Sequence, residues 1–100
     1  MSFEATLEKV QTVAAVADPL GHTVKFTFTG GEGVIFIDGT KDPNLVSTED
    51  ADAECSISVD KGDFDKLMSG DLNPMMAFMG GKLKIEGNMG IAMKLSSLFG

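Results

Sequence analysis

Three segments of this 100-residue chain alternate between apolar and polar side chains, and this pattern limits the folds the chain can adopt. In residues 23–29, 53–60 and 82–86, apolar and polar or small side chains take turns along the chain. Because successive side chains of a strand point to opposite faces, each segment is predicted to be a strand with one buried face. Such strands predict a mostly antiparallel sheet, solvated on one side and covered by helices on the other.

Helical segments are predicted by apolar residues at spacings of three and four and by their start and stop signals. Asp60 and Asn73 suit the N-cap position, Pro74 suits the first helical position, and Gly70 suits a helix end. The resulting helices cover residues 3–17, 60–69, 74–79 and 88–98.

The remaining segments predict further strands and turns. Residues 30–33 hold three glycines and predict a hairpin turn. Residues 34–37 are apolar on both faces, so this strand is expected to be covered more fully than the first. Residues 38–52 are read as a loop with a short strand near Leu45 and Val46. The fold class is therefore α+β with two layers, in a single domain over residues 1–100.

Composition and charge restrict the partners. Residues 1–80 carry a net charge of −9 and residues 81–100 a net charge of +2, and the chain has no arginine, Trp or Tyr. Nucleic acid is a poor partner, because phosphate contacts need a basic face and base stacking needs aromatic rings. The start of the chain has no secretion signal, no stretch approaches the ~20 apolar residues of a membrane span, and Cys55 is the single cysteine, so a cytoplasmic location is expected.

The C-terminal third is rich in methionine and has more apolar surface than a two-layer domain needs. All methionines except Met1 lie in residues 68–93. The apolar side chains of helix 88–98 span an arc of roughly 220°, whereas packing on a sheet needs only about 100°. This surplus predicts a cavity, a partner surface or a membrane face. The alternative is a core rich in methionine, which fills irregular gaps well.

Other chemistry is weakly indicated. His22 and Cys55 have no catalytic motif around them, so both are read as structural residues. The acidic run at 49–54 lacks the spacing of a calcium loop, and no metal site or cofactor is predicted. No carboxylate pair or triad supports an enzyme.

Residues 70–95 closely resemble the C-terminal signature of the sterol carrier protein type 2 domain family. The resemblance is carried by the Asn73-Pro74 helix start, by the run Ala77-Phe78-Met79, and by Gly81-Lys82-Leu83-Lys84-Ile85-Glu86-Gly87 before a final helix with Ala92-Met93-Lys94-Leu95. It is strong over residues 53–98 and weaker over 1–52. It implies a five-stranded mixed sheet with helices on one side, and an apolar tunnel between the sheet and the C-terminal helices.

The resemblance also implies a lipid ligand: a fatty acid, fatty acyl-CoA, a sterol or a phospholipid. We therefore expect a non-enzymatic carrier, monomeric or weakly dimeric, with possible transient membrane contact. The alternative is an interaction module that uses the same apolar face to dimerise or to dock a partner. Lys82 and Lys84 are candidates for headgroup contacts. The candidate lining residues are Met75, Met76, Phe78, Met79, Leu83, Ile85, Met89, Ile91, Met93, Leu95 and Phe99.

Overall fold

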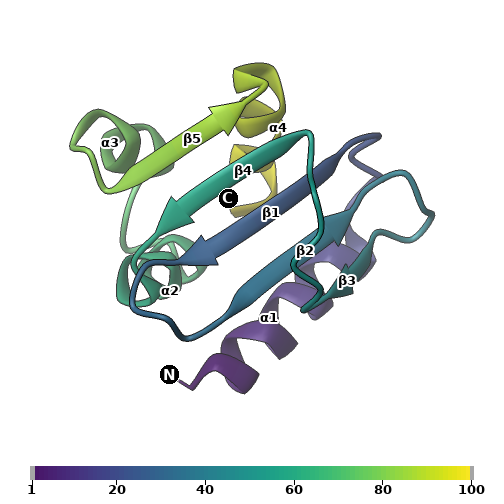
Figure 1. Cartoon of the computed structure of the whole chain (residues 1–100), viewed down its shortest axis with the longest axis horizontal. Helices are drawn as coiled ribbons and strands as arrows, with labels where there is room; N and C mark the ends of the chain where they lie inside the picture. The colour runs from purple at the N-terminus through teal and green to yellow at the C-terminus, as the bar shows by residue number, and fades with distance from the viewer. Residues whose placement is uncertain (1, 100) are drawn as a thin grey trace.

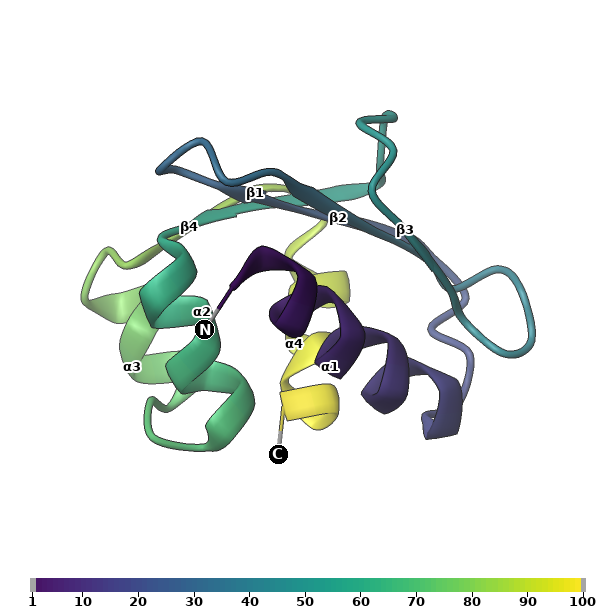
Figure 2. The ribbon, with the colours of Figure 1, turned by 90° about the horizontal axis from the view of Figure 1, so that it is seen from below.

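The sheet and the helices form two layers (Figures 1 and 2). The computed structural model describes the backbone of residues 2–99 and the side chains of residues 2–73 and 75–94. Within these residues the strands are β1 (Thr23–Phe28), β2 (Val34–Asp38), β3 (Leu45–Ser47), β4 (Cys55–Val59) and β5 (Leu83–Gly87). The helices are α1 (Phe3–Val16), α2 (Lys61–Ser69), α3 (Pro74–Met79) and α4 (Met89–Phe99). Among residues 2–99, no helix has both the length and the apolar character needed to cross a membrane.

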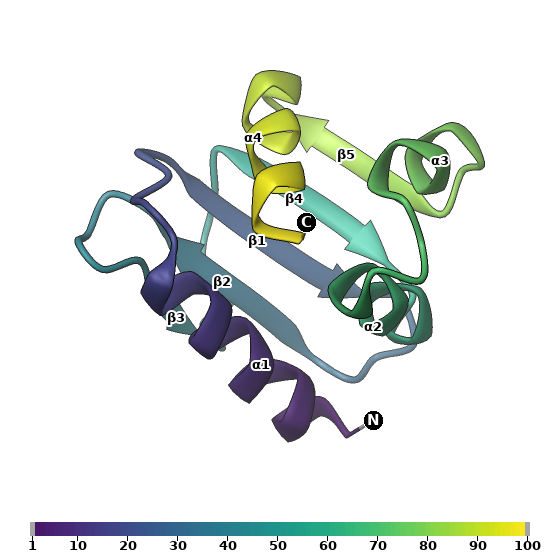
Figure 3. The same cartoon turned by 180° about the vertical axis from the view of Figure 1, so that it is seen from behind.

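The strand order is β3-β2-β1-β4-β5. Strands β1 and β4 are parallel, whereas the pairs β1–β2, β2–β3 and β4–β5 are antiparallel. The predicted five-stranded, mostly antiparallel mixed sheet is therefore confirmed, including the short strand near Leu45. Seen from the helical side, α1 runs along the β2 and β3 side of the sheet, α4 crosses β4, and α3 lies at the corner beside β5 (Figure 3).

The helix ends form where the local signals predict them. The Asp60 carboxylate accepts from the backbone N–H of Gly62 at 3.0 Å and caps α2. The Asn73 side-chain oxygen accepts from the N–H of Met75 at 2.9 Å and caps α3. Gly70 ends α2 with φ +85°, a conformation that is cheap only for glycine. These caps fix where α2 stops and α3 starts, and so place α3 at the corner of the sheet.

The core fills the space between the sheet and α1, α2 and α4. Phe64 of α2 lies 5.0 Å from the ring of Phe26 and 5.2 Å from that of Phe28 between centroids. Such tilted ring pairs add to the free energy gained from burial alone. The buried cluster is made of Val10, Val24, Phe26, Phe28, Ile35, Ile37, Cys55, Ile57, Val59, Phe64 and Ile91.

Strand β2 is not covered more fully than β1, so that prediction is wrong. Burial alternates along both strands, and Val34 and Phe36 of β2 are only partly buried. The reason is that the described helices cover only the other face of the sheet (Figure 2). The connection from β3 to β4, residues 48–54, passes over this open face, where Lys25 Nζ lies 2.9 Å from Asp50 Oδ1.

Asn44 ties the start of β3 to the end of α1. Its buried amide nitrogen donates to the carbonyl of Ala14 at 3.0 Å and to that of Asp18 at 3.2 Å. Its oxygen accepts from the N–H of Leu20 at 3.0 Å. The side chain thus satisfies backbone groups that the end of a helix leaves without intrahelical partners. The sequence places Asn44 in a loop and gives no sign of this role.

Candidate functional site

The methionines of the C-terminal third lie mostly on the surface. Met79, Met76 and Met93 have 81, 70 and 67% of their area exposed, and Met75 and Met89 are also exposed. Of the methionines whose side chains are described, Met68 is the one that is partly buried against the core. The alternative of a methionine-rich core is therefore wrong for the described side chains. That core is built mainly from Phe, Ile and Val, whose few rotamers specify a single packing.

Helix α3 has one side toward the domain and one toward solvent. Ala77 is fully buried. At 3.6 residues per turn, Met75 and Met79 lie on the side opposite to Ala77, and Met76 and Phe78 flank them. Phe78 is the least exposed of these four side chains, at 40%. Among the described side chains of this helix, Ala77 is the one that is fully buried, Phe78 is partly covered, and the methionines are mostly exposed.

Strand β5 and helix α4 place the other candidate lining residues differently. Leu83 and Ile85 are partly buried and pack against the core. Ile91 is 2% exposed and is itself a core residue. The side chains of Leu95 and Phe99 lie outside the described residues. The candidates whose side chains are described therefore divide into exposed residues on α3 and α4, partly buried residues on β5, and the buried Ile91 on α4.

A small apolar cavity lies between α1, α2 and the sheet. Its volume is about 10 Å³, which is room for one water molecule at most. A site for a lipid-sized ligand needs at least ~300 Å³. None of the candidate lining residues whose side chains are described borders this cavity. The tunnel between the sheet and the C-terminal helices stays a prediction. The cavity is lined by Val10, Val13, Ala14, Phe26, Ile37, Phe64 and Met68.

Lys82 and Lys84 border an open polar hollow of about 360 Å³ at the end of the sheet. Two carboxylates share the hollow with them, and Lys82 Nζ lies 3.9 Å from Asp63 Oδ1. The hollow therefore has mixed charge rather than a purely basic character. Its lining is Thr29, Ser58, Asp60, Asp63, Gly81, Lys82 and Lys84.

Asp65 connects α1 to α2. One carboxylate oxygen accepts from Thr6 Oγ1 at 2.7 Å, and the other accepts from Lys61 Nζ at 2.9 Å. Both Thr6 and Lys61 are buried. The pairing of Lys61 with Asp65 was not predicted, although their spacing of four on a helix is a local signal that could have indicated it. Thr6 was missed, because its partner is 59 positions away and local spacing carries no information about it.

His22 and Cys55 have structural surroundings. The Nδ1 atom of His22 lies 3.3 Å from Glu54 Oε2, which also accepts from the N–H of Thr23 at 3.0 Å. Cys55 is fully buried, and burial raises the pKa of its thiol above the ordinary value. A thiol of this kind is a poor nucleophile, because the thiolate is the reactive form. In the part of the chain that the structure describes, no group of three His, Cys, Asp or Glu side chains could hold a metal ion.

The fold and the family comparison agree. A model of the SCP-2 sterol transfer family matches residues 3–100, so the chain belongs to that family. Among solved structures, the solution NMR structure of palmitated SCP2L2 from Aedes aegypti is similar with a TM-score of 0.77. That similarity covers 99% of this chain and 95% of the other at 20% identity, and it concerns the fold.

Curated relatives are longer proteins. Hydroxysteroid dehydrogenase-like protein 2 of Xenopus laevis is 40% identical over 79 residues, which are 76% of this chain and 19% of that protein. Sterol carrier protein 2 of Homo sapiens is 49% identical over 55 residues, or 55% of this chain and 10% of that protein. The chain thus spans about a tenth to a fifth of the length of these relatives. Family membership gives it a lipid-binding or lipid-transfer role.

Proposed function

We propose that the chain is a non-enzymatic carrier that holds one lipid with a long apolar chain between the sheet and the C-terminal helices. Candidate ligands are a fatty acid, a fatty acyl-CoA, a sterol or a phospholipid. We also propose that it does so in the cytoplasm. The observation that carries the proposal is the apolar surface of α3 and α4, which the core does not use.

The driving force would be desolvation of the apolar chain. Burial is worth ~0.8 kcal/mol per methylene, so roughly ten to twelve carbons supply micromolar affinity before ordering costs. Phe78, Leu83 and Met89 offer partly exposed apolar contacts from α3, β5 and α4. Because methionine is unbranched and polarizable, such a site adapts to chains of different length. Selectivity between neighbouring chain lengths should be weak.

Room for the ligand would come from movement of the short C-terminal helices. The closed arrangement has a cavity of about 10 Å³, on the α1 and α2 side. Helix α3 is anchored to the domain by the small Ala77 and by part of the Phe78 ring, so its displacement would lose less packing than opening of the Phe64 cluster. Lys82 and Lys84 lie on the edge strand, from which long lysine side chains could extend to a charged headgroup.

Native mass spectrometry of gently purified protein, combined with titration of a fluorescent fatty acid, tests the proposal. The expected result is a bound lipid at one per chain and saturable binding of the probe. Met89→Gln should weaken probe binding about tenfold, because it places an amide where the chain would lie. Val16→Gln is the matched control. Val16 is 85% exposed at the end of α1, so this variant should bind the probe like the wild-type protein.

Three results would count against the carrier. The bare polypeptide with no probe binding would contradict it. Equal losses of probe affinity in Met89→Gln and Val16→Gln would show that the probe does not bind at the proposed site. A tight, lipid-free dimer in light scattering would favour the interaction module instead.

A further inference from the structure

Strand β5 leaves one edge of the sheet open. It is the last strand in the order β3-β2-β1-β4-β5, so β4 is its only neighbour in the sheet among the described residues. Just beyond β5, the N–H of Asn88 donates to the carbonyl of Glu54 at 3.3 Å. Because the backbone groups of a strand point alternately to its two sides, this bond places the N–H and C=O groups of Leu83, Ile85 and Gly87 on the side away from β4. The edge therefore offers a row of backbone donors and acceptors to another strand.

The charges beside this edge are complementary to themselves. Lys84 and Glu86 are exposed and alternate with Ile85, which packs on the core, so both lie on the open face of the sheet. When two copies of β5 pair antiparallel with Ile85 opposite Ile85, Lys84 of each copy lies opposite Glu86 of the other. Sliding one strand by two residues would instead put Lys84 opposite Lys84 or Glu86 opposite Glu86. A lysine usually discourages pairing at a sheet edge, but here the register about Ile85 gives it a partner of opposite sign.

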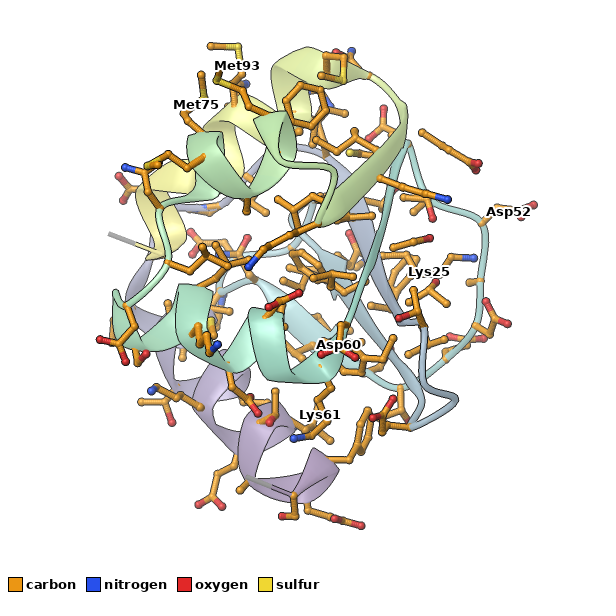
Figure 4. All side chains as sticks on the ribbon, turned by 90° about the vertical axis from the view of Figure 1, so that its left-hand side faces the viewer. Lys25, Asp52, Asp60, Lys61, Met75 and Met93 are labelled. Carbon is orange, nitrogen blue, oxygen red and sulfur yellow. The ribbon has the colours of Figure 1, made fainter. Side chains whose placement is uncertain are left out.

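Exposed methionines lie at both ends of β5. Helix α3 is held at the start of the strand, where the N–H of Lys82 donates to the carbonyl of Ala77 at 2.8 Å, and α4 begins at Met89, just after its end. Figure 3 shows the two helices at opposite ends of the strand. Met75 of α3 and Met93 of α4 are 57 and 67% exposed, and both extend toward the side of the molecule on which β5 is the outermost strand (Figure 4).

An antiparallel pair of β5 strands brings these two ends together. Because the start of one strand lies beside the end of the other, α3 of one copy comes next to the beginning of α4 of the second copy, on the same face of the sheet. Apolar surface that one copy leaves exposed is then covered by the other. The overall charge adds to the preference for this edge. The chain has a net charge of −7, whereas residues 81–100 have +2, so two copies repel each other least when these residues meet.

We infer that the edge of β5 is a docking surface for a second copy of this chain. The two β5 strands pair antiparallel about Ile85 and join the two sheets into one. Association is weak and reversible, because a five-residue strand with its flanking helix ends buries less than the ~800 Å² per partner of a standard interface. The dimer is expected at protein concentrations on the order of hundreds of micromolar. The docking surface goes beyond the proposed carrier function and does not depend on it, since the strands can pair with or without a bound lipid.

Charge reversal tests the register. Lys84→Glu and Glu86→Lys each put like charges opposite one another twice in the dimer, so each should weaken dimerisation about tenfold in sedimentation equilibrium at low ionic strength. The double variant Lys84→Glu/Glu86→Lys restores both pairs and should dimerise like the wild-type protein. The two single variants change the net charge in opposite directions, so a loss in both cannot come from net charge. Lys41→Glu, at an exposed position in the loop before β3, is the matched control and should have little effect.

Disulfide formation between copies gives a second readout. Opposite residues that do not exchange hydrogen bonds have Cα atoms ~4.5 Å apart, which suits a disulfide. In a Cys55→Ala background, a mixture of Lys84→Cys and Glu86→Cys should therefore cross-link under mild oxidation faster than either variant alone. Circular dichroism checks that each variant is folded. Glu86→Lys should still bind the fluorescent fatty acid, so that loss of the dimer and failure of the carrier function are distinguished.

Several outcomes would overturn the inference. A chain that stays monomeric up to about 1 mM has no such docking surface. Dimerisation that Met75→Gln/Met79→Gln abolishes and the charge reversals at positions 84 and 86 leave unchanged would place the contact on α3 rather than on β5. Dimerisation that both single reversals weaken and the double variant does not restore would exclude pairing about Ile85.

Discussion

The region from α1 to α2 and the region from α3 to α4 use apolar residues in different ways. In the first region, Phe26, Phe64 and Ile37 are buried and pack in one arrangement. In the second, Met76 and Met79 are exposed and pack against little. Aromatic and branched side chains specify a unique core, whereas methionine adapts to what it meets. The first region therefore builds the packed core, and the exposed methionines of the second region fit the proposal that this region binds the ligand.

Strand β5 marks where the two regions meet. It is paired with β4 over its whole length, and Gly87 lies opposite Cys55 at its end. Gly87 has φ +101°, and a Cβ added there would lie 2.3 Å from the carbonyl oxygen of Glu54. The close approach fixes β5 to the rigid sheet. The adaptable part of the second region is therefore its helices and not its strand.

The largest expected difference between the regions is in thiol reactivity. Cys55 is fully buried in β4, so labelling it requires opening of the core, which costs up to the full free energy of unfolding. Burial also raises the pKa of the Cys55 thiol, which lowers the thiolate fraction near pH 8. Ellman's reagent at that pH should label wild type at least about a thousandfold more slowly than Cys55→Ala/Met79→Cys.

Denaturant and alkaline pH provide the controls for this comparison. In concentrated denaturant the two thiols should react at similar rates. Because the pKa of Cys55 is higher in the folded than in the unfolded protein, the unfolded protein loses this proton first as the pH rises. The contribution of the protonated thiol to the free energy of unfolding is therefore complete at neutral pH and declines above about pH 9. If the two folded proteins were labelled at rates within tenfold of each other, Cys55 would be nearly as accessible as position 79. The core would then not be more firmly closed than α3, and the proposed difference between the two regions would be wrong.

The next largest effect is expected at the centre of the aromatic cluster. Phe64→Ala removes a buried ring that contacts Phe26 and Phe28, and should lower the free energy of unfolding by about 3–5 kcal/mol. Urea unfolding followed by far-UV circular dichroism measures this. The matched variant is Phe78→Ala in α3, where the ring is 40% exposed and the loss should be clearly smaller. Similar losses at both positions would argue that α3 is as firmly packed as α2.

Gly87→Ala tests how firmly β5 is held against β4, where the two regions meet. The positive φ and the contact with the Glu54 carbonyl should make it destabilising by roughly 2 kcal/mol. Gly31→Ala is a suitable control: its φ is +81°, but nothing lies near an added Cβ, so it has only the backbone penalty. If urea unfolding gave the same small loss for both, β5 would be able to move away from β4 and would belong to the adaptable region.

Much of the fold could be predicted from local sequence, because its signals are local. The two-residue period of β1, β4 and β5 and the caps at Asp60 and Asn73 each depend on neighbouring residues. Prediction from the sequence failed for side-chain contacts between residues that are distant along the chain. The links of Asn44 to α1 and of Thr6 to Asp65 join positions 24 or more residues apart, and no period records them. The outer face of β2 was misjudged because apolar residues need not be covered.

The candidate site could be predicted as a region but not as a set of contacts. Helix α3 is apolar on nearly every side, so periodicity cannot choose the side that faces the domain. In the structure, Ala77, the smallest residue of the helix, faces the domain, and the methionines are exposed. For α4, the apolar arc alone could not show that Ile91 is buried while Met89 and Met93 are exposed.

The smallest expected effect is on the stability of a methionine variant. Met79→Gln replaces a side chain that is 81% exposed, so the free energy of unfolding should change by no more than about 0.5 kcal/mol. Glutamine is a good helix former of similar length, which keeps the helical propensity of α3 nearly constant. Urea unfolding measures the change, with Val16→Gln as the reference for an exposed apolar residue elsewhere. A loss above about 1 kcal/mol in Met79→Gln alone would mean that the methionine packs on the domain in solution, and stability and binding would then no longer divide between the two regions.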